Sequence, residues 1–132
     1  MAKLTIEDLI NKKEMLKEQS KVKTCLIHCK KLGGELEAHS LSKGDLADVR
    51  VKMDKDAIAG TYKLIYMSID DLRNPQLLEA FGCKTESEKI VGRLFPHENE
   101  LVAVGNIIKN LNGLGYLKAD EIYVKELEDL KN

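Results

Sequence analysis

The Gly33-Gly34 pair restricts the fold of this chain more than any other feature of its sequence. It separates two runs with β propensity, and a two-residue hairpin loop favours glycine because its positions need positive φ. A loop of that length also sets the register, so that His28 should face His39. The sequence therefore predicts a β-hairpin within residues 20–41.

Alternation along the hairpin separates a core face from a wet face. In the same register Cys29 lies opposite Ala38, and both belong to the core face. The core face is expected to carry Cys25, Ile27, Cys29, Leu36 and Ala38, and the wet face Leu26, His28, Lys30, Glu35, Glu37 and His39. The hairpin should therefore pack against the rest of the chain through one side only.

Helix signals surround the hairpin. Thr5 is a plausible N-cap for a helix over residues 6–18, and Ser42 and Asp56 can cap two helices that follow the hairpin. Asn74-Pro75 places an N-cap residue before a proline at the first helical position. The pattern predicts an α+β fold, a mainly helical single domain with an N-terminal β-hairpin packed on several short helices.

The expected organisation within 132 residues is one domain in four segments. These are an N-terminal helix over 1–19, the hairpin over 20–41, a helical core over 42–114 and a C-terminal helix over 115–132. The central and most buried helix should be the one whose apolar row is Ile58, Tyr62, Ile65, Tyr66 and Ile69.

Composition excludes several classes of function. The net charge of -1 gives no basic field for nucleic acid, and no apolar run approaches the ~18 residues that a membrane span needs. The start of the chain, with Glu7 and Asp8, lacks the apolar centre of an export signal. We therefore expect a cytoplasmic protein that binds neither nucleic acid nor membrane and keeps its three cysteines reduced.

The hairpin raises the question of a metal site, because Cys25 and Cys29 have a permissive spacing and His28 and His39 lie nearby. The predicted faces argue against it, since both cysteines face the core and both histidines point away. The alternatives are buried free thiols, a structural zinc or an exposed histidine pair that holds a metal with Glu35 or Glu37. Buried thiols are favoured, with no metal and no cofactor.

The sequence shows no catalytic constellation. Cys83 follows Gly82 at an expected helix end, where the helix dipole disfavours a thiolate, so it should be a loop thiol. Asp70-Asp71 and the pair Asp54 and Asp56 are acidic, but aspartates of this kind commonly serve as caps and turns. We therefore predict that the protein is not an enzyme.

Both terminal segments carry narrow apolar stripes within highly charged sequence. Short amphipathic helices either dock on their own domain or lie in the groove of a partner, and the sequence leaves both open. Self-association is a further possibility. The candidate partner-binding residues are Leu9, Ile10, Leu16, Tyr123, Leu127 and Leu130.

Residues 62–68 (YKLIYMS), 74–82 (NPQLLEAFG), 91–95 (VGRLF) and 100–111 follow one another in an order that resembles the XkdN-like tail assembly chaperones. That family occurs in phages, prophages and phage-like elements of Gram-positive bacteria. The likeness also includes the charged N-terminal helix and the Gly-Gly hairpin, and it extends from about Thr5 to Leu114. Its motifs consist of core and capping residues, so they carry no reactive groups.

The resemblance implies a protein that binds the long, helical tape measure protein during tail morphogenesis and keeps it from aggregating until the tail tube polymerises around it. The tail tube protein is a second candidate partner. The resemblance also implies an accessory viral protein that is absent from the finished virion and has no catalytic activity. In many phages a programmed frameshift extends a minority of the chains.

A different reading of the same features is a small adaptor or regulatory protein of a prophage with a protein or DNA partner. A DNA reader would need a basic recognition helix. The N-terminal helix has the most lysines, but Glu7, Asp8, Glu14 and Glu18 offset them.

Overall fold

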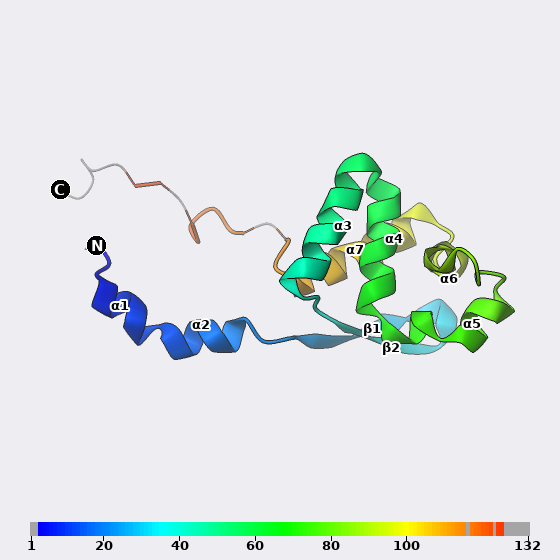
Figure 1. Cartoon of the computed structure of the whole chain (residues 1–132), viewed down its shortest axis with the longest axis horizontal. Helices are drawn as coiled ribbons and strands as arrows, with labels where there is room; N and C mark the ends of the chain where they lie inside the picture. Colours follow the sequence, from blue (N-terminus) through cyan, green and yellow to red (C-terminus); the bar gives the residue numbers. More distant parts are fainter. Residues whose placement is uncertain (1–2, 116, 123, 126–132) are drawn as a thin grey trace. The chain divides into compact units, whose positions relative to one another are not determined.

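The computed structural model describes residues 3–115, 117–122 and 124–125. Its contacts divide the chain into two compact units (Figure 1). One unit is Val22–Gly115, and the other is Met1–Lys21 together with Tyr116–Asn132. The expected α+β fold, mainly helical with one hairpin packed on helices, is confirmed, and the hydrophobic core lies within Val22–Gly115.

In the first unit, the predicted N-terminal helix is present but divided. Helix α1 spans Ile6–Asn11 and helix α2 spans Lys13–Gln19, with Lys12 as the C-cap of the first and the N-cap of the second. At the other end of the chain, Asp120 and Glu121 form a turn, so the described part of the expected C-terminal helix is not helical.

The second unit begins with the hairpin. Strand β1 spans Thr24–Cys29 and strand β2 spans Gly34–His39, and they pair in antiparallel fashion. A short 3-10 turn, η1 (Lys30–Leu32), and Gly33 connect them. Gly33 has a φ of 75°, the left-handed conformation that favours glycine, whereas Gly34 already belongs to the strand.

The predicted register is wrong. Cys29 pairs with Gly34 instead of Ala38, and His28 pairs with Glu35 instead of His39. The connection is longer than two residues because only Gly33 takes the left-handed turn position. The partner of each β1 residue moves by four positions (38 − 34 = 4), an even number, so every side chain keeps its predicted face.

The predicted core face is confirmed. Ile27 and Ala38 are buried, while Cys25, Cys29 and Leu36 are partly buried and pack against the core. The opposite face, with Leu26, is exposed.

The hairpin leads into helices whose starts follow the predicted caps. Helix α3 spans Lys43–Lys55 and is capped by Ser42, and helix α4 spans Ala57–Ser68 and is capped by Asp56. The Asp56 carboxylate accepts the Ile58 and Ala59 N–H groups at 3.1 Å. The remaining elements are η2 (Asp70–Arg73), α5 (Pro75–Ala80), η3 (Ser87–Lys89), α6 (Ile90–Leu94) and α7 (Glu98–Leu111).

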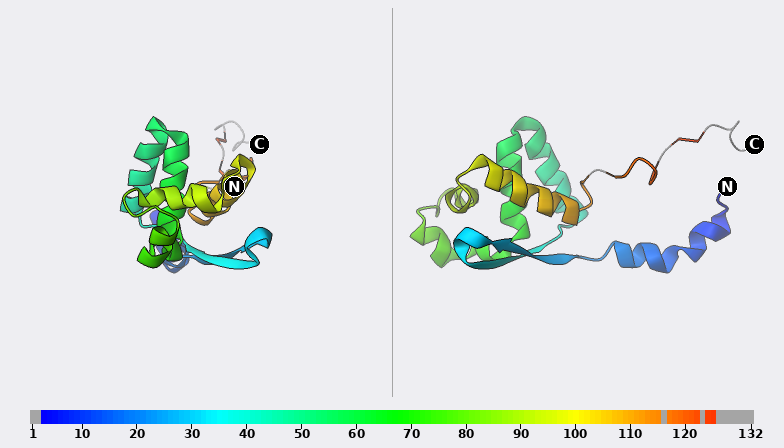
Figure 2. Two further views of the ribbon diagram at one scale, coloured as in Figure 1. Left: turned by 90° about the vertical axis from the view of Figure 1, so that its right-hand side faces the viewer. Right: turned by 180° about the vertical axis from the view of Figure 1, so that it is seen from behind.

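Helix α7 lies beside the α3–α4 pair and also contacts both strands (Figure 2). The core is centred on α4, as predicted, and the expected row is buried or partly buried except at Ile58, with Ile69 at its end fully buried. Leu64 and Ile65 are fully buried, Tyr62 and Tyr66 are partly buried, and Ile58 is 61% exposed. One edge of the wide apolar stripe of α4, which carries Ile58, is therefore not covered by the core.

Candidate functional site

The segment α1–α2 is held together by local hydrogen bonds. Thr5 Oγ1 accepts the Asp8 N–H at 3.1 Å, and Asp8 Oδ2 accepts the Thr5 N–H at 2.9 Å. This reciprocal capping box satisfies two N–H groups at the helix start, and its hydrogen bonds lower the pKa of Asp8. The predicted N-cap at Thr5 is confirmed.

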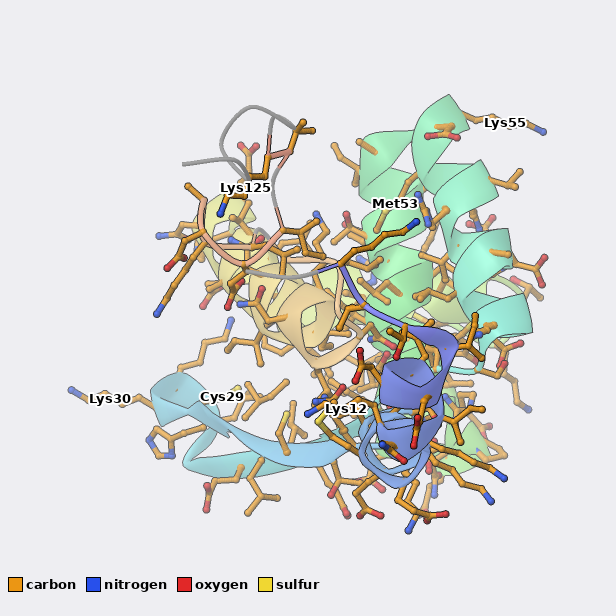
Figure 3. All side chains as sticks on the ribbon, turned by 90° about the vertical axis from the view of Figure 1, so that its left-hand side faces the viewer. Lys12, Cys29, Lys30, Met53, Lys55 and Lys125 are labelled. Atoms are coloured by element: carbon orange, nitrogen blue, oxygen red, sulfur yellow. The ribbon has the colours of Figure 1, made fainter. Side chains whose placement is uncertain are left out.

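The segment has no buried residue along either helix. Its side chains extend outward from the ribbon on all sides (Figure 3). The large apolar ones are between 48% and 73% exposed: Leu4, Ile6, Leu9, Ile10, Met15 and Leu16. The predicted partner-binding residues of the N-terminal segment are therefore accessible.

Part of this apolar group forms a stripe. Leu9 and Ile10 follow Ile6 by three and four residues, so helical periodicity places these three on one side of α1, while Leu16 belongs to the separate helix α2. Isolated helices of this length are marginal in water. Packing of these side chains against another apolar surface would stabilise both helices, which is the helix-in-groove mode of recognition.

The predicted partner-binding residues at the other end, Tyr123, Leu127 and Leu130, lie outside the described residues. Their neighbours Ile122 and Val124 are 79% and 86% exposed.

A second apolar surface, which the sequence analysis missed, lies between α4 and α7. The helices approach closely at Gly105, where an added Cβ would lie 3.2 Å from Thr61 Cγ2. Ile58 and Val102, 61% and 51% exposed, lie beside this floor. We call this hollow of about 400 Å³ the α4–α7 groove. Its lining includes Ala57, Ile58, Thr61, Pro96, Leu101, Val102 and Gly105, with Glu98 and Lys109.

Two signals could have indicated the α4–α7 groove. Val102 lies just outside the row of Leu101, Val104 and Ile108 that builds the buried side of α7. Ile58 widens the apolar stripe of α4 in the same way. Apolar residues at the edges of the buried sides of two helices form a groove only if the helices pack side by side, and the sequence does not specify that packing.

Two larger hollows have charged rims. One, of about 720 Å³, is lined by Tyr62 and Tyr66 and bordered by the Lys52–Glu88 ion pair at 2.7 Å. The other, of about 630 Å³, contains Lys31, whose Nζ lies 2.8 Å from Glu100 Oε2.

In the second hollow the Lys31 ammonium also lies 5.6 Å from the centroid of the Phe95 ring. The hydrogen bond from Lys31 lowers the pKa of Glu100. Lys31, one of the two lysines that line this hollow, is thus already engaged.

The structure separates the cysteine and histidine side chains of the hairpin. Cys25 and Cys29 lie on the core face, and burial raises the pKa of Cys29. His28 is exposed on the other face, near the tip where Lys30 extends outward (Figure 3). His39 bonds to Asp70. Within the described ranges no three His, Cys, Asp or Glu side chains are grouped so as to hold a metal ion.

Cys83, expected as a loop thiol, does lie in the connection after α5 but is only 2% exposed. Its thiol lies 3.5 Å from the Phe81 carbonyl oxygen. Burial of this kind is typical of a structural cysteine.

None of the described helices has both the length and the apolar character that crossing a bilayer requires. Comparison of the chain with protein-family models, with curated proteins and with solved structures gives no match. The features that bear on function are therefore those of the molecule itself: an exposed amphipathic helical segment and an apolar groove on a small α+β unit.

Proposed function

We propose that this chain is a tail assembly chaperone of a phage or prophage, and that it binds the tape measure protein through the α1–α2 segment. The observation that carries the proposal is the exposed stripe of Ile6, Leu9 and Ile10 on α1, together with exposed Leu16 on α2, in two helices that have no buried residue. The sequence resemblance to the XkdN-like family supports the same conclusion.

The physical basis is mutual coverage of apolar surface. A long helical protein exposes apolar stripes before its tube assembles around it, and exposed stripes promote aggregation. A second amphipathic helix can cover such a stripe by packing side chains into its grooves. The lysines and glutamates of α1–α2 would then face water on the outside of the complex.

The test is capture of the tape measure protein by co-expression and affinity purification of the chaperone. The variant Leu9→Asp with Ile10→Asp removes two apolar contacts and adds two charges. Burial of one such side chain contributes about 1.5–3 kcal/mol, so we expect the dissociation constant to rise at least about 100-fold.

The control is Val51→Asp, which introduces an aspartate at an apolar side chain of α3 that is 57% exposed. It should leave capture unchanged. The variant Leu127→Asp with Leu130→Asp tests the C-terminal candidates separately. Undiminished capture by the α1–α2 variant, with circular dichroism showing a folded protein, would contradict the proposed binding segment.

The unaltered protein tests whether the chain is a chaperone at all, independently of the proposed binding segment. If the unaltered chain neither captures the tape measure protein nor reduces its aggregation on co-expression, the proposed function is wrong whatever the variants do.

A further inference from the structure

Strand β1 has an edge that no other strand covers. Within the described residues the sheet consists of β1 and β2 alone, so each strand leaves one row of backbone N–H and C=O groups without a strand to pair with. Beside β2 lies η2, which is joined to it by the bond between His39 and Asp70.

The hydrogen bonds of the hairpin show which residues form the row on β1. The Lys23 carbonyl oxygen accepts the Ser40 N–H at 2.8 Å, so Lys23 directs its backbone groups toward β2. Because the direction alternates along an antiparallel pair, Thr24, Leu26 and His28 direct theirs away from β2. The side chains of these three residues are exposed as well.

The composition of β1 leaves this edge unprotected. Edge strands commonly carry charged side chains or proline, which prevent pairing with another chain. Strand β2 follows this rule with Glu35 and Glu37, but β1 reads Thr-Cys-Leu-Ile-His-Cys and contains neither a carboxylate, a lysine, an arginine nor a proline. Near its middle Leu26 is 63% exposed. The edge of β1 is therefore suited to pairing with a further strand.

A second copy of β1 supplies a strand that matches this row. In an antiparallel pair centred on Leu26, Leu26 lies opposite Leu26 of the second copy, and Thr24 lies opposite His28. Every outward backbone group of one strand then meets an outward group of the other, because the three residues are spaced evenly about Leu26. The arrangement is isologous and closes with a two-fold axis.

Charge favours the same register. Lys23 lies opposite Cys29 of the second copy, and Lys30 lies opposite Val22, so no two like charges face each other. Pairing through the β2 edges would instead bring the glutamates of two copies together.

Other occupants fit this edge less well. Within the described part of the chain β1 and β2 are the strands, and β1 cannot pair with itself in one molecule. A helical partner, such as the tape measure protein, satisfies its own backbone groups and has none to offer a strand edge.

From these observations we infer that β1 pairs antiparallel with β1 of a second copy about a two-fold axis at Leu26, which joins two hairpins into a four-stranded sheet. Two short strands bury less than the roughly 1,200 Å² of a standard interface, so the dimer is weak and forms in proportion to concentration.

This inference goes beyond the proposed function, since it concerns β1 and needs no tape measure protein. Self-association of the purified chain and capture of the tape measure protein are measured separately. The failure of one is therefore distinguishable from the failure of the other.

Sedimentation equilibrium of the purified full chain over a range of concentrations tests the inference. The unaltered protein should dimerise. Leu26→Pro removes an N–H that points away from β2, so the hairpin should persist while the dimer loses two hydrogen bonds. Its dissociation constant should rise at least about 10-fold.

Glu35→Pro is the matched control, because it removes an N–H from the opposite edge of the same hairpin. It should leave the dissociation constant unchanged, and circular dichroism should show that both variants are folded. A monomer at every concentration of the unaltered protein, as expected if the edge is covered by its own chain or needs a different protein, would overturn the inference. So would a dimer that Leu26→Pro leaves undiminished.

A mixing experiment identifies the two-fold register without proline. Leu26→Lys and Leu26→Glu should each be monomeric, because the two introduced charges of a dimer are alike and lie opposite each other. A mixture of the two variants should form heterodimers, since an introduced lysine then faces an introduced glutamate. High salt should weaken these heterodimers.

The control pair is Ile58→Lys and Ile58→Glu, at an apolar side chain of α4 that is 61% exposed. Each should dimerise as the unaltered protein does, alone or mixed. If the two Leu26 variants are monomeric alone and also when mixed at low salt, Leu26 does not face its own copy, and the proposed pairing is wrong.

Discussion

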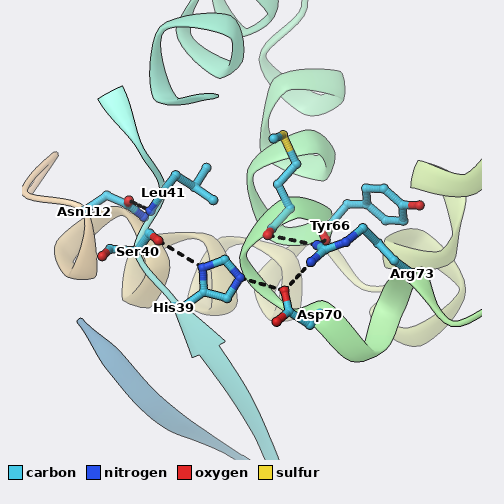
Figure 4. Close-up of polar contacts among 8 residues, drawn as sticks. His39, Ser40, Leu41, Tyr66, Asp70, Arg73 and Asn112 are labelled. Carbon is cyan, nitrogen blue, oxygen red and sulfur yellow. Dashed lines mark hydrogen bonds and ion pairs between the residues drawn. The ribbon is translucent and has the colours of Figure 1, made fainter. Parts of the chain in front are cut away.

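His39 Nε2 lies 2.7 Å from Asp70 Oδ1, and this contact joins the end of β2 to η2 (Figure 4). His39 Nδ1 lies 2.9 Å from the Ser40 carbonyl oxygen. Both partners are acceptors, so both ring nitrogens can donate only when the imidazole is protonated. Arg73 also pairs with Asp70 and donates to two carbonyl oxygens in the last turn of α4.

This arrangement predicts a pH-dependent stability. The hydrogen bond to the Ser40 carbonyl, together with Asp70, raises the pKa of His39 above its ordinary value of 6.5. A raised pKa means that the contact contributes fully below pH 6.5 and is lost as the pH rises through the folded-state pKa. The free energy of unfolding of the unaltered protein should therefore fall over this window relative to His39→Gln.

Urea unfolding at a series of pH values measures this difference. His28→Gln is the matched control, because His28 is exposed on the same hairpin. A difference between the unaltered protein and His39→Gln that stays constant with pH would contradict the protonated bridge.

Gly60 is required by the crossing of α3 and α4. A Cβ added there would lie 2.5 Å from Met53 Cα and 2.6 Å from Met53 N, and a backbone cannot yield as a flexible side chain can. Gly60→Ala should therefore lower the free energy of unfolding by about 1–3 kcal/mol, the cost of overpacking, despite the higher helix propensity of alanine.

Gly44 provides the matched control for this measurement, since it lies in α3 with nothing within 4 Å of its added Cβ. Gly44→Ala should leave stability unchanged or raise it by up to about 1 kcal/mol. Equal effects of the two substitutions in thermal or urea unfolding would show that the α3–α4 approach is not close.

Asn112 connects the exit of the hairpin to the end of α7 (Figure 4). Its Oδ1 accepts the Leu41 N–H at 2.7 Å and its Nδ2 donates to the Ile108 carbonyl oxygen at 2.9 Å. Asn112→Ala leaves the partly buried Leu41 N–H without this acceptor, so urea unfolding should show a loss of about 1–3 kcal/mol. Asn106→Ala, at an exposed site of α7, should change stability by less than about 0.5 kcal/mol.

Ser68 is fully buried at the end of α4, and among the described residues its Oγ has no hydrogen-bond partner. Removing an unsatisfied buried hydroxyl removes its desolvation cost. Ser68→Ala should therefore raise the free energy of unfolding by about 1 kcal/mol in urea. A decrease of similar size would mean that the hydroxyl does form a stabilising bond.

The hairpin shows which level of structure a local pattern can predict. Alternation identified the core face correctly, because the side that Ile27 and Ala38 occupy depends only on the period of a strand. The register was wrong because it depended on the loop, and the loop runs from Lys30 to Gly33 instead of through Gly33-Gly34.

The candidate site was predicted in part for the same reason. The apolar side formed by Leu9 and Ile10 follows from helical spacing, and the structure leaves it exposed together with Leu16. The α4–α7 groove was missed, because Ile58 and Val102 belong to helices that are distant in the sequence and become neighbours only when α7 packs against α4.

The sequence by itself determined where four of the helices begin and which way each strand faces. Thr5, Ser42, Asp56 and Asn74 all cap helices as predicted, because a cap involves hydrogen bonds over only two or three residues. Tertiary structure alone decided the exposure of Ile58 and the groove beside it. Those features depend on how much surface distant elements bury against one another, and no short stretch of the chain contains that information.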